Sequence, residues 1–326
     1  MTALRDIAGH EMIKQSLHNA LALDRVAHAY LFGGPPGVGK KTTAQAFAAA
    51  LLCRQGAGDA CGECGDCWRV QRGVHPDLQL IRPDGSSIKI NQLRAVQESA
   101  AFSSFSGGRR VYLVEQAEKM TLEAANCFLR ILEEPPGRVV FILVSDDPGG
   151  MLPTVLSRCH VYRFNPLARD EVLRVLAARL NAGGERAGVA ASLSGGSPGR
   201  AMELLETGDR RAELLDMLLR LVRERPGGFC WPPDSLSDRS GVEEWAGFLT
   251  VFFRDVMVWQ QTGAADLLVN ADYQEQIAEL AGAFSQREVL DILITAEKAA
   301  RQLANNANQR LVLDALFFKI AGIRDV

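Results

Sequence analysis

The stretch AHAYLFGGPPGVGKKTTAQAFAAALL, from Ala27 to Leu52, joins an apolar run, a glycine-rich turn and a helical pattern. A strand over 27–32, followed by this turn and a helix over 42–52, is the context that a Walker A loop requires. Glycines let backbone N–H groups turn towards phosphate oxygens, the helix N-terminus adds its dipole, and Lys40 adds a positive charge. The predicted nucleotide-binding residues of this loop are Gly34, Pro35, Pro36, Gly37, Val38, Gly39, Lys40, Lys41 and Thr42.

Two departures from the usual pattern argue against hydrolysis. The residue after Lys40, where a Ser or Thr hydroxyl would hold Mg²⁺, is Lys41, and Thr42 is turned by about 100° along the helix. At the end of a later apolar strand, an ATPase places an Asp for the metal and a Glu to orient water, whereas this chain has Glu115 and Gln116. The sequence therefore predicts a loop that holds ATP or ADP, or stands empty, with a poor magnesium site.

Short apolar runs alternate with helical patterns through the first half of the chain. Such alternation predicts a RecA-like α/β domain with a parallel sheet between helices. The run VVFILV over 139–144 is apolar on both faces, so it is expected in the middle of the sheet. The expected strands are 27–32, 78–81, 111–114, 139–144 and 161–164.

Beyond Pro166 the apolar spacing is helical throughout. We expect three domains: an α/β domain over 1–165, a small helical lid over 166–208 and an all-α domain over 209–326. The segment 225–240 is rich in proline and glycine, which predicts a loop.

The composition is that of a globular protein, with 326 residues, 47% of them hydrophobic and 23% charged. A net charge of -3 provides no broad basic field for non-specific DNA binding. No stretch approaches the roughly 18 consecutive apolar residues of a membrane span, so we expect a cytoplasmic protein.

Four of the seven cysteines are clustered, whereas Cys127, Cys159 and Cys230 are isolated. The cluster has the spacing C-x7-C-x2-C-x2-C, which lets paired thiolates reach one ion. Structural Zn²⁺ is the favoured interpretation, and an iron–sulfur cluster is the alternative. The predicted ligands are Cys53, Cys61, Cys64 and Cys67.

Read in order, these landmarks resemble the clamp-loader branch of the AAA+ ATPases, and within it the subunits of the bacterial DNA polymerase III clamp loader. The resemblance covers essentially the whole chain. The motifs that carry it are HAYLF from His28, the phosphate loop with its cysteine insert, LEEPP ending at Pro136, Ser157-Arg158-Cys159, GGSPGR ending at Arg200, and the segment 305–313.

The resemblance implies a subunit of a five-membered ring, whose last domain is the oligomerisation collar. It implies that Arg158 is an arginine finger, presented in trans to the γ-phosphate held by a neighbouring gamma or tau subunit. Ser145 and Asp146 match the first sensor position, where Asn is usual instead of Asp146, and Arg200 matches the second sensor.

The implied partners are the gamma/tau and delta subunits and, indirectly, the sliding clamp and primer-template DNA. The function expected is that of a non-hydrolysing subunit in an ATPase complex of a DNA polymerase holoenzyme. Two alternatives stay open: a competent ATPase that resembles gamma or tau, and a zinc-dependent DNA-binding module.

Overall fold

The computed structural model describes residues 3–56, 58–100, 102, 104–105, 107–206, 211–223, 239–304 and 307–321. The chain divides into two compact units, Met1–Glu203 and Leu204–Val326. Within the described ranges, no helix is both long and apolar enough to cross a membrane. Cys230 and most of the predicted loop 225–240 lie outside the described residues, and the end of that segment, from Arg239, is helical.

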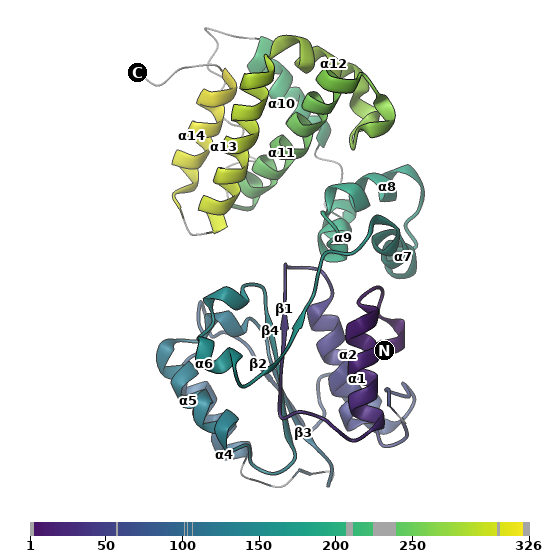
Figure 1. Cartoon of the computed structure of the whole chain (residues 1–326), viewed down its shortest axis with the longest axis vertical. Coiled ribbons are helices and arrows are strands. Elements are labelled where there is room, and N and C mark those ends of the chain that lie inside the picture. The colour runs from purple at the N-terminus through teal and green to yellow at the C-terminus, as the bar shows by residue number, and fades with distance from the viewer. Residues whose placement is uncertain are drawn as a thin grey trace. The chain divides into compact units, whose positions relative to one another are not determined.

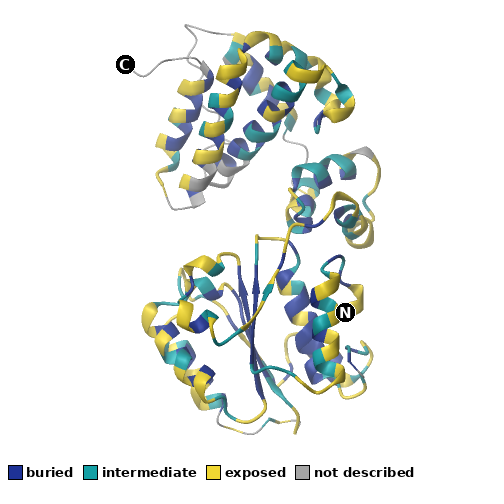
Figure 2. Ribbon diagram, viewed as in Figure 1, coloured by how far each residue is buried: buried dark blue, intermediate teal, exposed yellow. Residues whose placement is uncertain are grey.

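The first unit is built on a five-stranded parallel sheet in the order β2-β3-β4-β1-β5. The three inner strands, β3, β4 and β1, are almost entirely buried, whereas the edge strands β2 and β5 are mostly exposed or half-buried (Figure 2). The six residues of the run 139–144 lie in β4, in the middle of the sheet, and all seven residues of this strand are buried, so that prediction is confirmed. The strands are β1 (Ala29–Gly33), β2 (Leu78–Ile81), β3 (Arg110–Val114), β4 (Val139–Ser145) and β5 (His160–Arg163).

Helices cover both faces of this sheet, which confirms the predicted α/β fold class (Figure 1). One face packs against α1 (Glu11–Ala22) and α2 (Lys40–Leu52), and the cysteine segment with α3 (Gly65–Gln71) joins the same core. The opposite face packs against α4 (Ile90–Ala100), α5 (Leu122–Glu133) and α6 (Pro153–Leu156). Apolar residues on both faces of β1 and β4 are thereby removed from water.

Three helices follow the sheet: α7 (Arg169–Leu180), α8 (Gly184–Leu193) and α9 (Pro198–Glu206). The first unit includes α7, α8 and the part of α9 up to Glu203. We call these three helices the lid.

The second unit is all-helical, as predicted. A core of aromatic and aliphatic side chains, with Trp245 fully buried at its centre, joins its helices. Asp255 is also fully buried and accepts hydrogen bonds from the backbone N–H groups of Val269 and Asn270. The helices are α10 (Arg211–Arg223), α11 (Arg239–Thr262), α12 (Gln274–Ala283), α13 (Gln286–Ala304) and α14 (Gln309–Ala321).

Candidate functional site: a phosphate loop with internal ion pairs

The phosphate loop lies between the end of β1 and the start of α2, as the sequence predicts. Gly34 has a φ of 150°, and a Cβ there would lie 2.2 Å from the carbonyl oxygen of Phe164. Gly37 and Gly39 also have positive φ, which only glycine adopts readily. None of the described side chains caps the N-terminus of α2, so its first N–H groups remain open to a phosphate.

A cavity of about 1030 Å³ opens over this loop. Residues 37–42 of the loop line it, together with Glu115, Gln116 and Asp146 from the ends of β3 and β4. The lid contributes Arg174, Arg179 and Met202 among others, and the N-terminal segment contributes residues 5–9. Its chemistry and size fit the phosphates of a nucleotide at an open helix N-terminus.

The lid contacts the phosphate loop closely where Gly199 of α9 meets Gly37 of the loop. The N–H of Gly199 donates to the carbonyl oxygen of Gly37 at 3.0 Å, and Ser197 Oγ donates to that of Pro36 at 3.0 Å. A Cβ on Gly199 would lie 2.9 Å from the Cα of Gly37. The first turn of α9 therefore lies directly on the loop.

His10 holds the loop from the N-terminal side. Its Nε2 donates to the carbonyl oxygen of Val38 at 3.0 Å, and its ring packs at 4.6 Å against that of Phe164. Burial lowers the pKa of His10 below its ordinary value, which keeps the imidazole neutral in this position.

The ammonium of Lys40 is 3% exposed and is surrounded by three oxygens. It donates to the carbonyls of Gly34, at 2.6 Å, and Pro35, and it lies 2.7 Å from Asp146 Oδ1. An ammonium has three N–H groups, so all three have acceptors within the protein. A phosphate oxygen that engages Lys40 has to displace one of them.

The ammonium of Lys41 lies 3.1 Å from Oε2 of Glu115. Arg82 Nε also lies 3.0 Å from this oxygen, so one carboxylate oxygen serves two cations. Within the described part of the chain, Oε1 of Glu115 is buried and has no hydrogen-bond partner. The role of Arg82, which directly follows β2, could not be predicted from the sequence.

These residues do not fit a magnesium ion. Mg²⁺ requires an octahedral shell of oxygens, usually including a P-loop hydroxyl and a carboxylate. Here an ammonium takes the hydroxyl's place in the sequence and pairs with the carboxylate itself. Thr42 lines the cavity, but it stands one residue further along α2.

Arg158 lies on another part of the first unit and does not line the cavity. It follows α6, where its Nη1 donates to the carbonyl oxygen of Thr154 at 2.9 Å. Its Nη2 lies 2.7 Å from Oε1 of Glu133, at the end of α5. Both side chains remain partly exposed, at 35% and 52%. Glu133 belongs to the LEEPP motif, and the sequence alone suggested no role for it.

Arg200 lies in the first turn of α9 and is exposed. Its backbone nitrogen lies beside the phosphate loop, 3.3 Å from where a Cβ on Gly37 would stand, but Arg200 is not among the residues that line the cavity. Ser145, the other sensor candidate, is fully buried at the end of β4.

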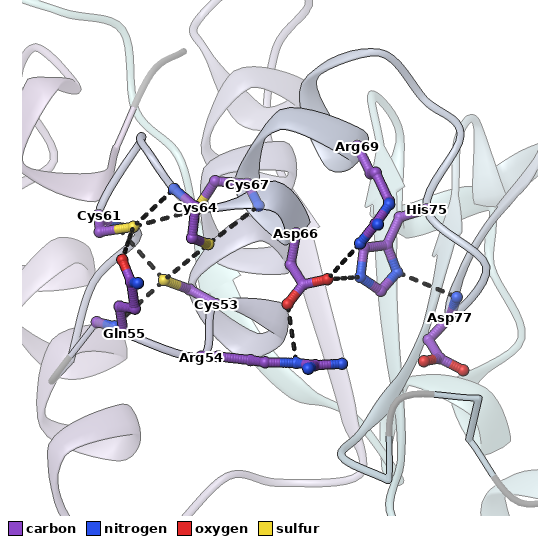
Figure 3. Close-up of polar contacts among 11 residues, drawn as sticks. Cys53, Arg54, Gln55, Cys61, Cys64, Asp66, Cys67, Arg69, His75 and Asp77 are labelled. Carbon is purple, nitrogen blue, oxygen red and sulfur yellow. Dashed lines mark hydrogen bonds and ion pairs between the residues drawn. The ribbon is translucent and has the colours of Figure 1, made fainter.

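The four clustered cysteines converge on one point (Figure 3). All four sulfurs lie within 4.8 Å of one another, and the pairs Cys53–Cys64 and Cys61–Cys67 are each 3.9 Å apart. A tetrahedral Zn²⁺ with Zn–S bonds of about 2.3 Å separates its sulfurs by about 3.8 Å. This arrangement fits one metal ion bound by four thiolates.

Backbone N–H groups are directed at the sulfurs, as in a metal-binding knuckle. The N–H groups of Gly56, Cys64 and Cys67 lie 3.2 to 3.4 Å from the sulfurs of Cys53, Cys61 and Cys64. Such bonds from Glu63 and Cys64 lower the pKa of Cys61 to about 6, whereas burial raises the pKa of Cys67. The backbone N–H donors therefore favour the thiolate form of Cys61.

Asp66 anchors the cysteine segment to the rest of the unit (Figure 3). Its two carboxylate oxygens lie 3.0 Å from Arg54 and from Arg69, and 3.4 Å from His75 Nε2. His75 Nδ1 in turn accepts from the N–H of Asp77, just before β2. The segment is therefore built into the domain, which suits a structural metal site.

Comparisons with known proteins relate this chain to subunits of DNA polymerase III. A family model described as "DNA polymerase III, delta subunit" matches residues 9–168, and one described as "DNA polymerase III, delta subunit, C terminal" matches residues 236–321. The DNA polymerase III subunit delta' of Bacillus subtilis is 29% identical, over 93% of this chain and 94% of its own length. That of Pseudomonas aeruginosa is 33% identical, over 91% and 92%.

Among solved structures, a DNA polymerase III gamma subunit-related protein from Thermotoga maritima is 16% identical to this chain. It has a TM-score of 0.43, with coverage of 94% of this chain and 99% of that one. The sequence relationship, which runs through both units, places this chain in the family of the DNA polymerase III delta-prime subunits.

Proposed function

We propose that this chain is a non-hydrolysing AAA+ subunit of a cytoplasmic clamp loader. In this role it assembles with gamma/tau and delta subunits and supplies Arg158 in trans, so that ATP held by a neighbour drives loading of a sliding clamp on primed DNA. The observation that carries this proposal is the pair of internal ion pairs, Lys40–Asp146 and Lys41–Glu115. An ATPase would direct the P-loop lysine at phosphate and the strand-end carboxylate at the metal. Here Lys40 and Glu115 are each already paired with another side chain.

The position of Arg158 supports its use in trans. A guanidinium that does not line its own cavity has no nucleotide of its own to act on. Nη1 donates to the carbonyl of Thr154 and to Ser157 Oγ, and Nη2 donates to Glu133, which leaves the second N–H of Nη2 and the Nε–H for phosphate oxygens. A partly exposed, oriented arginine is suited to stabilise charge on a partner's γ-phosphate.

The second unit is proposed to be the collar that joins the subunits. Exposed apolar residues on its helices support this role. Leu290 and Ile294, four residues apart on one face of α13, are 48% and 43% exposed, and Leu311 at the start of α14 is 67% exposed. Apolar side chains grouped on one helix face often mark a protein interface.

The cysteine site is proposed to hold Zn²⁺ as a structural ion. Four thiolate ligands leave no open position for a substrate. The buried sulfur of Cys67 lies in the same apolar core as α2, so the ion would brace the helix that follows the phosphate loop.

Reconstitution of the complex tests the arginine finger. With Arg158→Ala, DNA- and clamp-stimulated ATP turnover at the site that Arg158 serves should fall at least about a hundredfold. Arg158→Lys keeps the charge but not the planar fork, so it should restore little. Unchanged turnover with Arg158→Ala would end the proposal.

The purified chain by itself distinguishes the competing function. We expect no ATP turnover above background. If the chain alone hydrolyses ATP and Lys40→Ala abolishes this activity, the chain is a competent ATPase instead.

A further inference from the structure

The ammonium of Lys41 pairs directly with Glu115, the carboxylate at the strand end where a hydrolysing P-loop protein has a carboxylate for magnesium. We infer that this cavity binds a nucleoside polyphosphate free of magnesium, with Lys40 and Lys41 as its cations and Asp146 as the group that the phosphate displaces. The inference deepens the proposed function, since it names the form of nucleotide that a non-hydrolysing P-loop would hold.

The geometry of the strand ends carries the first step. In a hydrolysing site the metal is held between the residue after the P-loop lysine and a carboxylate at the end of another strand of the sheet. Here these two positions are Lys41 and Glu115, and their side chains meet at 3.1 Å without an intervening ion. Arg82 adds a second cation to the same carboxylate oxygen, so the trio keeps one net positive charge.

That positive charge faces the ligand. Lys41 is half exposed and lines the cavity, as do Lys40 and Glu115. A dication brought to the end of β3 would meet a carboxylate, Glu115, that already pairs with the Lys41 ammonium and the Arg82 guanidinium. A phosphate tetra-anion meets attraction instead, because the two lysines and the open N-terminus of α2 all favour negative charge.

Asp146 provides the competing anion. Its Oδ1 lies 2.7 Å from Lys40 Nζ, it lines the cavity, and its carboxylate is 44% exposed. Since the remaining two N–H groups of Lys40 point to loop carbonyls, the carboxylate holds the one donor that a phosphate oxygen would use. Its exposure lets it turn into solvent when a phosphate replaces it.

Equilibrium titration of the full chain with mant-ATP, in EDTA and in excess Mg²⁺, tests the inference. The wild type should bind at least as tightly in EDTA, because the magnesium complex carries two fewer negative charges. Asp146→Asn should bind about tenfold more tightly, since the carboxylate no longer competes. Lys41→Thr should lose about tenfold in EDTA and gain affinity when Mg²⁺ is added.

Lys89→Thr removes an exposed lysine that pairs with Asp84 outside the cavity, and it should titrate like the wild type. Thermal unfolding of each variant shows that it is folded. Tighter binding of the wild type by about tenfold in Mg²⁺, or no binding by either the wild type or Asp146→Asn, would overturn the inference. Either result would leave Arg158 and its test untouched, so failure here is distinguishable from failure of the proposed function.

Discussion

Arg158, in the turn that follows α6, and Glu133, at the end of α5, form an ion pair at 2.7 Å. Two helices that are separate in sequence thus fix the direction of one guanidinium. The carbonyl of Thr154 fixes it from the other side at 2.9 Å. The arginine is therefore oriented before any partner is present, which reduces the entropy lost when it engages a ligand.

Glu133 is expected to act as a positioning residue for Arg158. In the reconstituted complex, Glu133→Ala should reduce ATP turnover by about tenfold, less than Arg158→Ala, because the charge stays while its direction is lost. Its neighbour Glu134 is exposed, and Glu134→Ala is the matched control. Glu133→Gln, which still accepts a hydrogen bond, should recover part of the rate. Equal rates for Glu133→Ala and the control would show that the ion pair is only a surface contact.

The cysteine cluster should carry one zinc ion per chain. Metal analysis of the purified chain measures this directly, and cobalt substitution should give the absorption of a tetrahedral thiolate site. Cys64→Ser should lose the metal and lower the Tm by at least ~5 °C, since metal binding contributes to folding. Cys127→Ser, which alters a cysteine outside the cluster, should keep both. Iron and acid-labile sulfide in the purified chain would establish an iron–sulfur cluster instead.

Gly199 is expected to be essential for closing the lid on the phosphate loop. A Cβ there would lie 2.9 Å from the Cα of Gly37, and backbone atoms have little freedom to move away. Gly199→Ala should therefore lower the free energy of unfolding by about 1–3 kcal/mol, as measured by denaturant titration. Gly183→Ala, in the same lid with no neighbour within 4 Å of its Cβ, is the control. Equal stabilities of the two variants would show that the phosphate loop can shift to accommodate the added methyl group at little cost in free energy.

Stability should fall as the pH drops through about 6.5, and His10 should account for part of the fall. Burial lowers the folded-state pKa of His10, so the unfolded chain takes up a proton at a pH where the folded chain does not. The stabilisation is thus complete above the unfolded pKa and is lost below it. His10→Gln can still donate to the carbonyl of Val38, and it should flatten the dependence between pH 7 and 5.5. Equal pH dependences of wild type and His10→Gln, measured by denaturant titration at each pH, would show that His10 does not contribute to the slope.

Much of the fold was predictable because its signals are local. The buried run of β4, the strand-to-helix phosphate loop and the helical spacing after Pro166 each reflect short-range periodicity. The four cysteines are also close in sequence, so their convergence follows from the tight turns between them. The departures at Lys41 and Glu115 were visible in the same way, as residue types at known positions.

The partners of these residues could not be predicted, because they come from distant segments. Lys40 meets Asp146 because β1 and β4 are adjacent and parallel, with Gly33 opposite Ser145, so both strands end at the same edge of the sheet. Arg82 reaches Glu115 because β2 lies beside β3. The sequence gives the type of each side chain, but not which residue from a distant segment lies next to it in the folded protein.

The sequence by itself determined the α/β class, the phosphate loop and the cluster of four cysteines, since periodicity and spacing encode local structure. Only the tertiary structure decided the state of the phosphate loop. Strand order and register bring Asp146 to Lys40 and Glu115 to Lys41, and the contact of Gly199 with Gly37 brings the lid over the loop. The charge balance of the cavity is therefore a property of the folded sheet, because it depends on which strand ends lie side by side.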